Sequence, residues 1–454
     1  MQNCDFDVII IGAGPAGLSV GSELSKHCKV LIVDGKEKID DCTKSWFIPA
    51  FLVKGNSELE PFMTKGITRL LCNTASGKQT CWDTHLPDGY YYVDEHPLLQ
   101  FWGEKAQKLG AEILLNTYYT DHTVYENHVD VDTTKGRYSA KLLIDASGHD
   151  SQVKKKYNIE ERYYWWSVYG AIVNHPNGLH GMQNGDYMLW QTFKDTQSSD
   201  DVTLKGGRPV FEYEVLSETS TFALILYLRQ SKVQKDAMGA EFKHVLFEEE
   251  QTKQFRDCQI VEEKWGWYPS GDLTVQQSEN RVDFIGDAGG WTTPCGWGFG
   301  FIAYNYQAYV RRLLPLLNED RLDQTSLKEV IHFNIREKHQ ILMDAIASHF
   351  LANGTPDMLD RFIDFFNSND PLMCEKIFTL SITQEEIRQV AKHFFKFFNP
   401  LELLSIFPKE DIGLILKEIP LFIADGIGEA IDTLNGEPVP FKPAFDIDED
   451  PSRP

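Results

Sequence analysis

Residues 6–34 read FDVIIIGAGPAGLSVGSELSKHCKVLIVD, and their pattern indicates the fold class. It opens with a nearly continuous apolar run at 6–12 that is rich in β-branched residues, the pattern of a parallel strand buried on both faces. A glycine-rich turn and a segment with apolar residues at helical spacing follow, and 28–34 form a second apolar run. Strand, helix and strand in this order predict a βαβ unit, and hence an α/β fold with a doubly wound parallel sheet.

The turn carries glycines at the spacing of a dinucleotide-binding fingerprint. Gly12 permits a tight turn, Gly14 lets the backbone approach a pyrophosphate, and Gly17 lets the helix pack closely on the strand. At Ala16 the new helix offers free N–H groups and a partial positive charge to the phosphates. Asp34 ends the second strand, 22 residues after the first glycine, where it can accept hydrogen bonds from ribose hydroxyls and disfavours a 2′-phosphate. These five residues are predicted to bind the cofactor.

Two later strands also end in short polar motifs. Residues 141–151 read KLLIDASGHDS, and residues 284–290 read FIGDAGG. In this order after the glycine fingerprint, they resemble the glutathione-reductase-like FAD superfamily of hydroxylases, geranylgeranyl reductases, halogenases and lycopene cyclases. The resemblance implies that FAD is the cofactor, that Asp287 binds its ribityl or pyrophosphate part, and that Gly148 and Gly286 line the same site.

A glycine-rich stretch follows, because residues 294–300 read PCGWGFG. The resemblance places this stretch beside the flavin ring, where successive backbone N–H groups at the start of a helix can stabilise a reduced, anionic flavin. Relatives carry a P-x-x-G-x-G pattern, and the P-x-G-x-G spacing here predicts a loop that is one residue tighter. The candidate contacts are Pro294, Gly296, Trp297, Gly298 and Phe299.

Within that superfamily, several patches look most similar to the branch of lycopene cyclases and geranylgeranyl reductases. SVYGAIV at 167–173 resembles the Q-x-x-Y-G segment of the cyclases, DYMLWQ at 186–191 their M-D-W-R segment, and KSWF at 44–47 their T-W-x-F segment. The Phe-rich helices at 361–366 and 393–398 are similar too. The likeness spans most of the chain and implies an apolar substrate, such as a polyene or another isoprenoid.

The acids that these cyclases use are missing from their expected positions. Protonation of a polyene needs a carboxylic acid. Leu189 replaces the aspartate of the M-D-W-R segment, and Leu226 stands where a strand glutamate is expected. Glu212, Glu214 and Glu218 lie nearby as substitutes to consider, although a surface location is the simpler interpretation of each. The catalytic candidates, which include aromatic rings able to hold a cationic intermediate, are Glu214, Tyr227 and Trp297.

Other activities of the superfamily are alternatives. WGWYP at 265–269 resembles the halogenase W-x-W-x-I-P motif in letters but not in position, and Lys44 lies outside the pattern of the halogenase lysine. YYVDEHPLL at 91–99 lacks the arginine that hydroxylases carry. Lycopene-cyclase-like chemistry is therefore the leading prediction. The alternatives are an FAD-dependent reductase, monooxygenase or halogenase, supplied with electrons by NAD(P)H or a flavin reductase, and a catalytically inactive flavin-binding scaffold.

Composition limits the partners. The 454 residues carry a net charge of −23 with a pI near 5.0, which argues against nucleic acid and would be repelled by an anionic membrane. Eight cysteines show no CxxC pair and no metal-ligand spacing, so no metal site is predicted. No apolar run approaches the roughly 18 residues of a spanning helix. A cytoplasmic enzyme with an apolar small-molecule substrate is expected, with the Phe-rich helices as core or, alternatively, as a peripheral membrane contact.

The chain divides into four predicted parts. These are a discontinuous FAD-binding domain at 1–160 and 276–318, a β-rich substrate domain at 161–275, a helical C-terminal region at 319–435, and a Pro-rich, acidic tail at 436–454. Within the first part, the turn-rich segment 35–90 is interpreted as an excursion away from the core.

Overall fold

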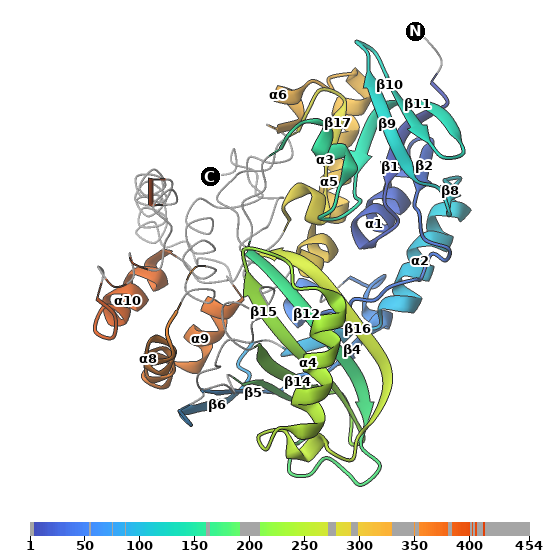
Figure 1. The fold of residues 1–454 in the computed structure, drawn as a ribbon. Coiled ribbons are helices and arrows are strands. Elements are labelled where there is room, and N and C mark those ends of the chain that lie inside the picture. The colour runs from blue at the N-terminus through green and yellow to red at the C-terminus, as the bar shows by residue number, and fades with distance from the viewer. Residues whose placement is uncertain are drawn as a thin grey trace.

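The computed structural model describes residues 4–53, 56–74, 76–86, 88–159, 164–190, 209–270, 278–291, 298–328, 349, 354–379, 384–399, 402, 405 and 412–413. These residues form two seven-stranded sheets and one three-stranded sheet, with helices packed against them (Figure 1). The predicted tail 436–454 lies outside the described residues.

The first sheet is built around the N-terminal βαβ unit. Its strands are β1 (Phe6–Ile11), β2 (Val30–Val33), β8 (Glu112–Leu114), β9 (Tyr119–Val124), β10 (Val129–Thr133), β11 (Gly136–Asp145) and β17 (Val282–Phe284). The order is β8-β2-β1-β11-β10-β9, with β17 beside the end of β11. β8, β2, β1, β11 and β17 run parallel, while β10 and β9 add an antiparallel extension. The predicted parallel sheet is therefore confirmed.

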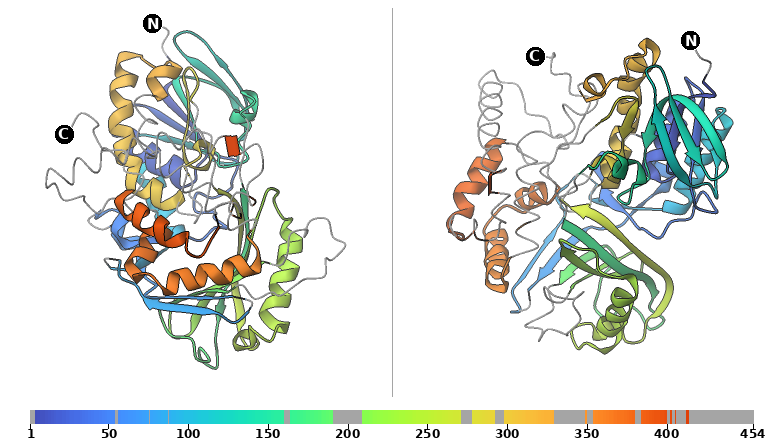
Figure 2. Two further views of the ribbon diagram at one scale, coloured as in Figure 1. Left: turned by 90° about the vertical axis from the view of Figure 1, so that its left-hand side faces the viewer. Right: turned by 45° about the horizontal axis from the view of Figure 1, so that its top comes forward.

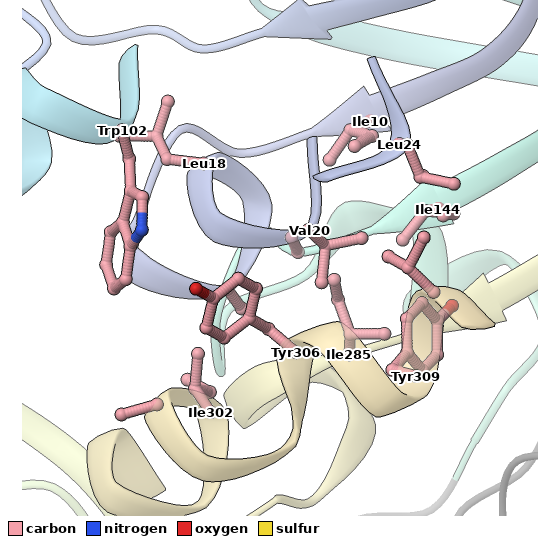
Figure 3. Packing of buried hydrophobic residues seen from close by; sticks show 14 of the residues in the cluster. Ile10, Leu18, Val20, Leu24, Trp102, Ile144, Ile285, Ile302, Tyr306 and Tyr309 are labelled. Atoms are coloured by element: carbon pink, nitrogen blue, oxygen red, sulfur yellow. The ribbon is translucent and has the colours of Figure 1, made fainter. Parts of the chain in front are cut away.

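Helices cover one face of this sheet. They are α1 (Pro15–Leu24), α2 (Glu95–Lys108) and α5 (Gly298–Glu319). Figure 3 shows Trp102 of α2 and Tyr306 of α5 close to Leu18 of α1, in a core that continues to apolar side chains of β1 and β11. On the opposite face of the sheet, residues of the antiparallel extension, such as Val129 and Val131 of β10, pack with apolar residues of the parallel strands. Short helices α3 (Gln152–Lys156), α6 (Gln324–Leu327) and η5 (Gly286–Gly289) follow strands or helices of the same body.

The second sheet has the order β16-β12-β15-β14-β13-β5-β6. Its strands are β5 (Arg69–Asn73), β6 (Gln79–Asp83), β12 (Tyr164–Asn174), β13 (Asp186–Trp190), β14 (Val210–Val215), β15 (Ser220–Arg229) and β16 (Gln259–Ser270). α4 (Lys235–Glu248) and η4 (Lys253–Phe255) pack on one face. The predicted substrate domain 161–275 leaves out β5 and β6, which come from the segment before it.

A three-stranded sheet, β3-β7-β4, is formed by the chain between β2 and α2 of the first body. Its elements are β3 (Phe47–Pro49), η1 (Ala50–Leu52), η2 (Glu60–Phe62), β4 (Met63–Lys65) and β7 (Tyr90–Val93). The interpretation of 35–90 as an excursion is wrong here, because Ile48 and Leu52 are buried in the core of the first body. The reason is close packing on α5, where a Cβ on Gly300 would lie 2.8 Å from Leu52 Cδ1. Runs this short show no periodicity.

Three helices of the C-terminal region lie beyond β6 of the second sheet (Figure 2), and the first two of them contact that strand. They are α8 (Pro356–Asn367), α9 (Pro371–Phe378) and α10 (Gln384–Phe394). Glu375 of α9 accepts hydrogen bonds from Trp82 Nε1 at 3.1 Å and from the Leu86 backbone N–H at 2.9 Å. Among the Phe-rich stripes, Phe394 stacks on Phe398 at 4.3 Å, so this part of the stripes is core. Within the described part of the chain, no helix is both long enough and apolar enough to cross a membrane.

Candidate cofactor and substrate site

The parallel strands of the first sheet end at one edge, and the glycine turn lies there. Gly12 has φ +108°, and a Cβ on it would lie 2.3 Å from Ala146 O. A Cβ on Gly17 would lie 1.9 Å from Gly12 O. Both distances are far shorter than a real Cβ atom can approach another atom, so glycine is required at both positions. The geometry agrees with the predicted roles of Gly12 in the turn and of Gly17 in packing α1 on the sheet.

Gly14 differs from both, because it faces open space. Among the described residues, no atom lies within 4 Å of a Cβ built on Gly14. Gly14 is also the N-cap of α1, and no described side chain caps the helix there. The N–H groups of the first turn, which includes buried Ala16, are thus left for an anion, and the helix dipole favours negative charge at this end. An open glycine in front of an uncapped helix fits a pyrophosphate.

Asp34 binds the backbone of the glycine turn through its carboxylate. Its carboxylate accepts hydrogen bonds from the Ala13 N–H at 2.6 Å and from the Lys36 N–H at 2.8 Å. Lys36 Nζ in turn donates to Ala13 O at 2.6 Å, and burial lowers the pKa of this lysine. Sequence reasoning missed Lys36, although its place two residues after the strand-ending acid is a readable signal. The turn therefore carries a cation next to the predicted ribose ligand.

The motif at the end of β11 forms a rigid polar turn. Asp145 is fully buried, and its Oδ1 accepts hydrogen bonds from the Ser147 N–H at 3.0 Å and from Ser147 Oγ at 2.6 Å. Burial raises the pKa of Asp145, while the hydrogen bonds from Ser147 and Ser151 oppose that rise. Asp145 is thus a structural residue, and it sets the path of the chain to Gly148. Gly148 has φ +82°, with no described atom within 4 Å of its Cβ position.

The third motif brings Asp287 next to residues from two distant segments. Gly286 has φ +61°, and its Cβ position lies 2.9 Å from Ala16 Cβ, which puts the motif against the start of α1. Asp287 Oδ2 lies 3.2 Å from Lys44 Nζ. A Cβ on Gly298 would lie 3.6 Å from Asp287 Oδ1. Four of the predicted cofactor segments, at 12–17, 145–148, 286–287 and 298, therefore converge at one edge of the sheet.

The flavin-loop candidates are only partly described. Pro294, Gly296 and Trp297 lie outside the described residues. Phe299 is 5% exposed, and its ring stacks on Trp46 with centroids 4.7 Å apart and planes 5° apart. Its side chain is therefore a packing residue in the core, and the predicted cofactor contact is left to its backbone.

We call the edge of the first sheet at which the predicted cofactor segments converge the cofactor edge. Four consecutive residues, which we call the 44–47 segment, link this edge to the rest of the molecule. Lys44 pairs with Asp287, and Ser45 is hydrogen-bonded to Tyr92 OH of β7. Trp46 stacks on Phe299 at the start of α5. Phe47 lies 5.4 Å from the ring of Tyr187 on β13. The KSWF letters marked this segment in the sequence, but its contacts with Asp287 and Phe299 lie more than 240 residues away along the chain.

The second sheet carries a pair of buried acids. Glu212 and Glu214 of β14 are 5% and 3% exposed. The surface interpretation is therefore wrong for both and right for Glu218, which is exposed in the turn after β14. Burial raises the pKa of Glu212 to about 8, against a hydrogen bond with Tyr187 that lowers it. Burial and the neighbouring Glu212 raise the pKa of Glu214 well above its usual range.

Strand register places Glu212 between the two positions that lack the expected acids. Glu212 is paired with Leu189 of β13 on one side and with Leu224 of β15 on the other. Leu226 lies two residues after Leu224, and so on the same face of β15. Glu214 lies opposite Phe222. Residues packed against the Phe222, Leu224 and Leu226 cluster of this face are Tyr92, Trp166, Val168, Ile172, Val210 and Leu216. The face is apolar apart from the acids and a few hydroxyl or indole groups, as an apolar substrate would require.

Tyr227 does not share this face. It belongs to the cluster beneath α4 on the opposite side of the sheet, and the Arg229 guanidinium lies 4.7 Å from the centre of its ring. Successive residues of a strand point to opposite faces, so Leu226 and Tyr227 cannot serve one site. Tyr227 and Glu214 therefore lie on opposite faces of the sheet, and the prediction that both belong to one catalytic site is wrong.

Comparison with known proteins gives a family match over most of the chain. The family model described as "Lycopene cyclase protein" matches residues 7–401. A rifampicin monooxygenase from Streptomyces venezuelae is 28% identical over 158 residues. That alignment covers 33% of this chain and 33% of the monooxygenase, so the chain matches only about a third of this curated relative.

Solved structures share the fold at low sequence identity. A geranylgeranyl bacteriochlorophyll reductase-like protein from Thermoplasma acidophilum has a TM-score of 0.67 at 12% identity, over 88% of this chain and 99% of that one. The halogenase PltM has a TM-score of 0.59 at 13% identity, over 96% and 97% of the two chains. A flavoprotein/dehydrogenase from Cytophaga hutchinsonii has a TM-score of 0.59 at 13% identity, over 86% and 96%. A further structure of PltM contains FAD.

Proposed function

Since the chain belongs to the lycopene cyclase protein family, we propose that it converts a polyene or another largely apolar isoprenoid by acid-initiated cyclisation. It is an FAD-dependent enzyme of the superfamily that also contains reductases, monooxygenases and halogenases. The observation that carries the cyclisation proposal is the buried Glu212–Glu214 pair on the apolar face of the second sheet.

A carboxyl group must be protonated at neutral pH to act as this acid. The pKa of Glu212 is raised to about 8 by burial, close to the working pH at which general acids are most effective. Burial, and then the neighbouring Glu212, raise the pKa of Glu214 well above its usual range, so the pair favours protonated carboxyl groups. Glu212 also lies between Leu189 and Leu226, so a single acid on the middle strand replaces the two acids missing from its neighbours.

The proton balance is that of an isomerisation. The Glu212 carboxyl donates its proton to a terminal double bond, and the resulting carbocation is attacked by a second double bond, which closes a ring. Loss of a proton from the ring to the Glu212 carboxylate restores the acid and leaves the mass of the product unchanged. The rings of Tyr92 and Trp166, which pack on the same face, stabilise the cation.

The residues at the cofactor edge fit FAD. The uncapped α1 and the open position at Gly14 receive the pyrophosphate, and Asp34 takes the ribose hydroxyls. Asp287 and the backbone at Gly298 lie together for the ribityl and flavin end. Reduced FAD, when bound, would supply either a negative charge that stabilises a nearby carbocation or a hydride that reduces it.

The test is anaerobic incubation of the photoreduced, FAD-loaded protein with a panel of linear polyenes, with product mass read by mass spectrometry. We expect a product of unchanged mass. Glu212→Gln should lower turnover by about 10²–10⁴-fold, and the turnover of the parent should fall as pH rises through about 8, where the acid loses its proton. Glu218→Gln, an exposed acid on the same hairpin, is the matched control. Full turnover in Glu212→Gln would exclude this acid.

A second candidate is reduction of an isoprenoid double bond. The geranylgeranyl reductase-like structure supports it, since its fold matches over 99% of that chain. In this reaction the same carboxyl would donate a proton while a hydride reached the neighbouring carbon, so the product would gain two hydrogens. A gain of oxygen or halogen on admitting air would instead indicate a monooxygenase or halogenase.

A further inference from the structure

Lys44 reaches the cofactor edge from outside the three motifs that form it. It comes from the 44–47 segment, and its ammonium lies 3.2 Å from Asp287 Oδ2. Its aliphatic stem crosses β16, where a Cβ on Gly266 would lie 3.3 Å from Lys44 Cγ. The neighbouring Thr43 carbonyl accepts a hydrogen bond from the Trp265 N–H at 2.9 Å. Lys44 is therefore held between the second sheet and the end of β17.

Two other basic groups lie in this neighbourhood, His149 and Lys232, and they are neutral and paired, respectively. Burial, and then the charge of Lys44, lower the pKa of His149 to about 4, so this imidazole is uncharged at neutral pH. Lys232 pairs with Asp150 at 2.7 Å and lies 4.2 Å from the centre of the Trp165 ring. Among the described residues, Lys44 is the basic side chain that pairs with the carboxylate of Asp287.

We propose that Lys44 is a positioning residue of the FAD site, which orients Asp287 and favours the reduced, anionic flavin over the oxidised one. This inference rests on FAD being the cofactor and does not depend on the cyclisation. Asp287 alone would place a negative charge beside a cofactor that becomes more negative on reduction, and repulsion between them would disfavour reduced FAD. The ammonium of Lys44 offsets that charge, and solvent screens the pair only in part because the side chains of Lys44 and Asp287 are 33% and 19% exposed.

The arrangement also explains why the cation comes from this segment. Trp46, two residues on, is stacked on Phe299, and Gly266 leaves room for the lysine stem. The position of Lys44 is thus fixed by packing on both sides. A lysine on a mobile surface loop would lose most of its effect to solvent and to side-chain entropy.

The experiment compares Lys44→Met, Lys44→Gln and Lys44→Arg with the matched control Lys232→Met. Affinity for oxidised FAD is read from quenching of flavin fluorescence, and the midpoint potential of the bound flavin from dye-equilibrated reduction. We expect Lys44→Met and Lys44→Gln to weaken binding of reduced FAD about tenfold more than binding of oxidised FAD, which lowers the midpoint potential by about 30 mV for a two-electron couple. Lys44→Arg should keep the parent potential, and Lys232→Met should leave it unchanged.

The outcomes separate the inference from the proposed function. An unchanged potential and affinity in folded Lys44→Met or Lys44→Gln would overturn the role of Lys44, whatever reaction the enzyme performs. An equal shift in Lys232→Met would show a general effect of charge and would also overturn it. If Lys44→Met fails to fold, as judged by urea unfolding of the apoprotein, the Gln variant, which keeps a donor for Asp287, decides the question. Failure of the parent to cyclise polyenes, with the potential shift intact, would sink the proposed function alone.

Discussion

Gly14 and Gly17 lie three residues apart in the same turn, yet a methyl group would meet different surroundings at each. At Gly17 it would lie 1.9 Å from Gly12 O, whereas at Gly14 it would point into space free of described atoms. Gly14→Ala should therefore cost the apoprotein no more than about 1 kcal/mol, the loss of a favourable N-cap, but weaken FAD binding about tenfold or more by blocking the pyrophosphate. Gly17→Ala should cost the apoprotein about 3 kcal/mol or more through overpacking.

Urea unfolding of the two apoproteins and fluorescence titration with FAD separate the two effects. Unimpaired FAD binding by Gly14→Ala would mean that the cofactor does not approach the turn at this residue. An apoprotein of Gly17→Ala as stable as the parent would mean that α1 can move away from β1 at little cost, contrary to the close contact described above.

Glu212 makes stability depend on pH. Its pKa is about 8 in the folded protein because of burial, against about 4.3 for a glutamate in an unfolded chain. Between these values the folded state keeps a proton that the unfolded state has lost, so the free energy of unfolding falls as pH rises across this window. Glu212→Gln should flatten that slope, and Glu218→Gln should not. The measurement is urea unfolding at intervals from about pH 5 to about pH 8; identical slopes in parent and Glu212→Gln would contradict the raised pKa.

At the scale of single residues, the sequence predicts what depends on neighbours along the chain. The turn glycines follow from spacing between a strand and a helix. The burial of Glu212 and Glu214 does not, because charged residues alternating with apolar ones in VFEYEV are typical of a strand with one exposed face. That second face is covered in three dimensions by residues such as Tyr92, far away in the chain. Lys44 and Asp287 are likewise 243 residues apart.

At the scale of elements, α2 and β16 are joined by a buried ion pair. Lys264 of β16 is 2% exposed at its side chain, and its Nζ lies 2.6 Å from Glu262 and also contacts Glu95 of α2, which is 4% exposed. His96 completes a cluster of groups that resembles a metal site in composition. The ammonium of Lys264 already supplies the positive charge among these carboxylates.

Removal of that ammonium should leave Glu95 buried without its partner. Lys264→Met is therefore expected to lower the free energy of unfolding by about 3–5 kcal/mol. Adding Glu95→Gln should restore part of that loss, because the uncompensated charge is gone. Lys243→Met is the matched control, since Lys243 forms an exposed pair with Glu263 of the same strand and should cost at most about 1 kcal/mol. Denaturant unfolding measures all four proteins; no loss in Lys264→Met would mean that Glu95 takes up a proton at little cost.

Strands with a continuous apolar pattern were predictable, and strands of mixed polarity were not. The runs that form β1, β2, β11, β12 and β15 are apolar enough to be recognised alone. β5 and β6 have only five residues each, with mixed burial, and they gain their place by pairing with β13 and with each other. A boundary at residue 161 drawn from local pattern therefore separates this hairpin from the sheet that it completes.

At the scale of the whole molecule, the net charge of −23 makes local cations important at the cofactor edge. FAD carries a negative pyrophosphate, and the field of an acidic protein repels it. Lys36, Lys44 and the N-terminus of α1 counter this field within the range of a Debye length, about 8 Å at physiological salt. The order of the three FAD motifs predicted this edge as a whole, since parallel strands bring their carboxyl ends together. The resemblance predicted an apolar substrate, but the sequence did not predict which face of the second sheet is apolar and open to it, because no local pattern shows which face a helix will cover.

The 44–47 segment has a consequence for engineering. Its four side chains contact, in order, Asp287, Tyr92 of β7, Phe299 at the start of α5 and Tyr187 of β13. Under the proposed function, a library that randomises this segment would alter flavin chemistry and substrate choice together, and a selection for activity could not tell the two changes apart. Variation at Phe47 with Lys44 and Trp46 held fixed would confine the search to substrate choice.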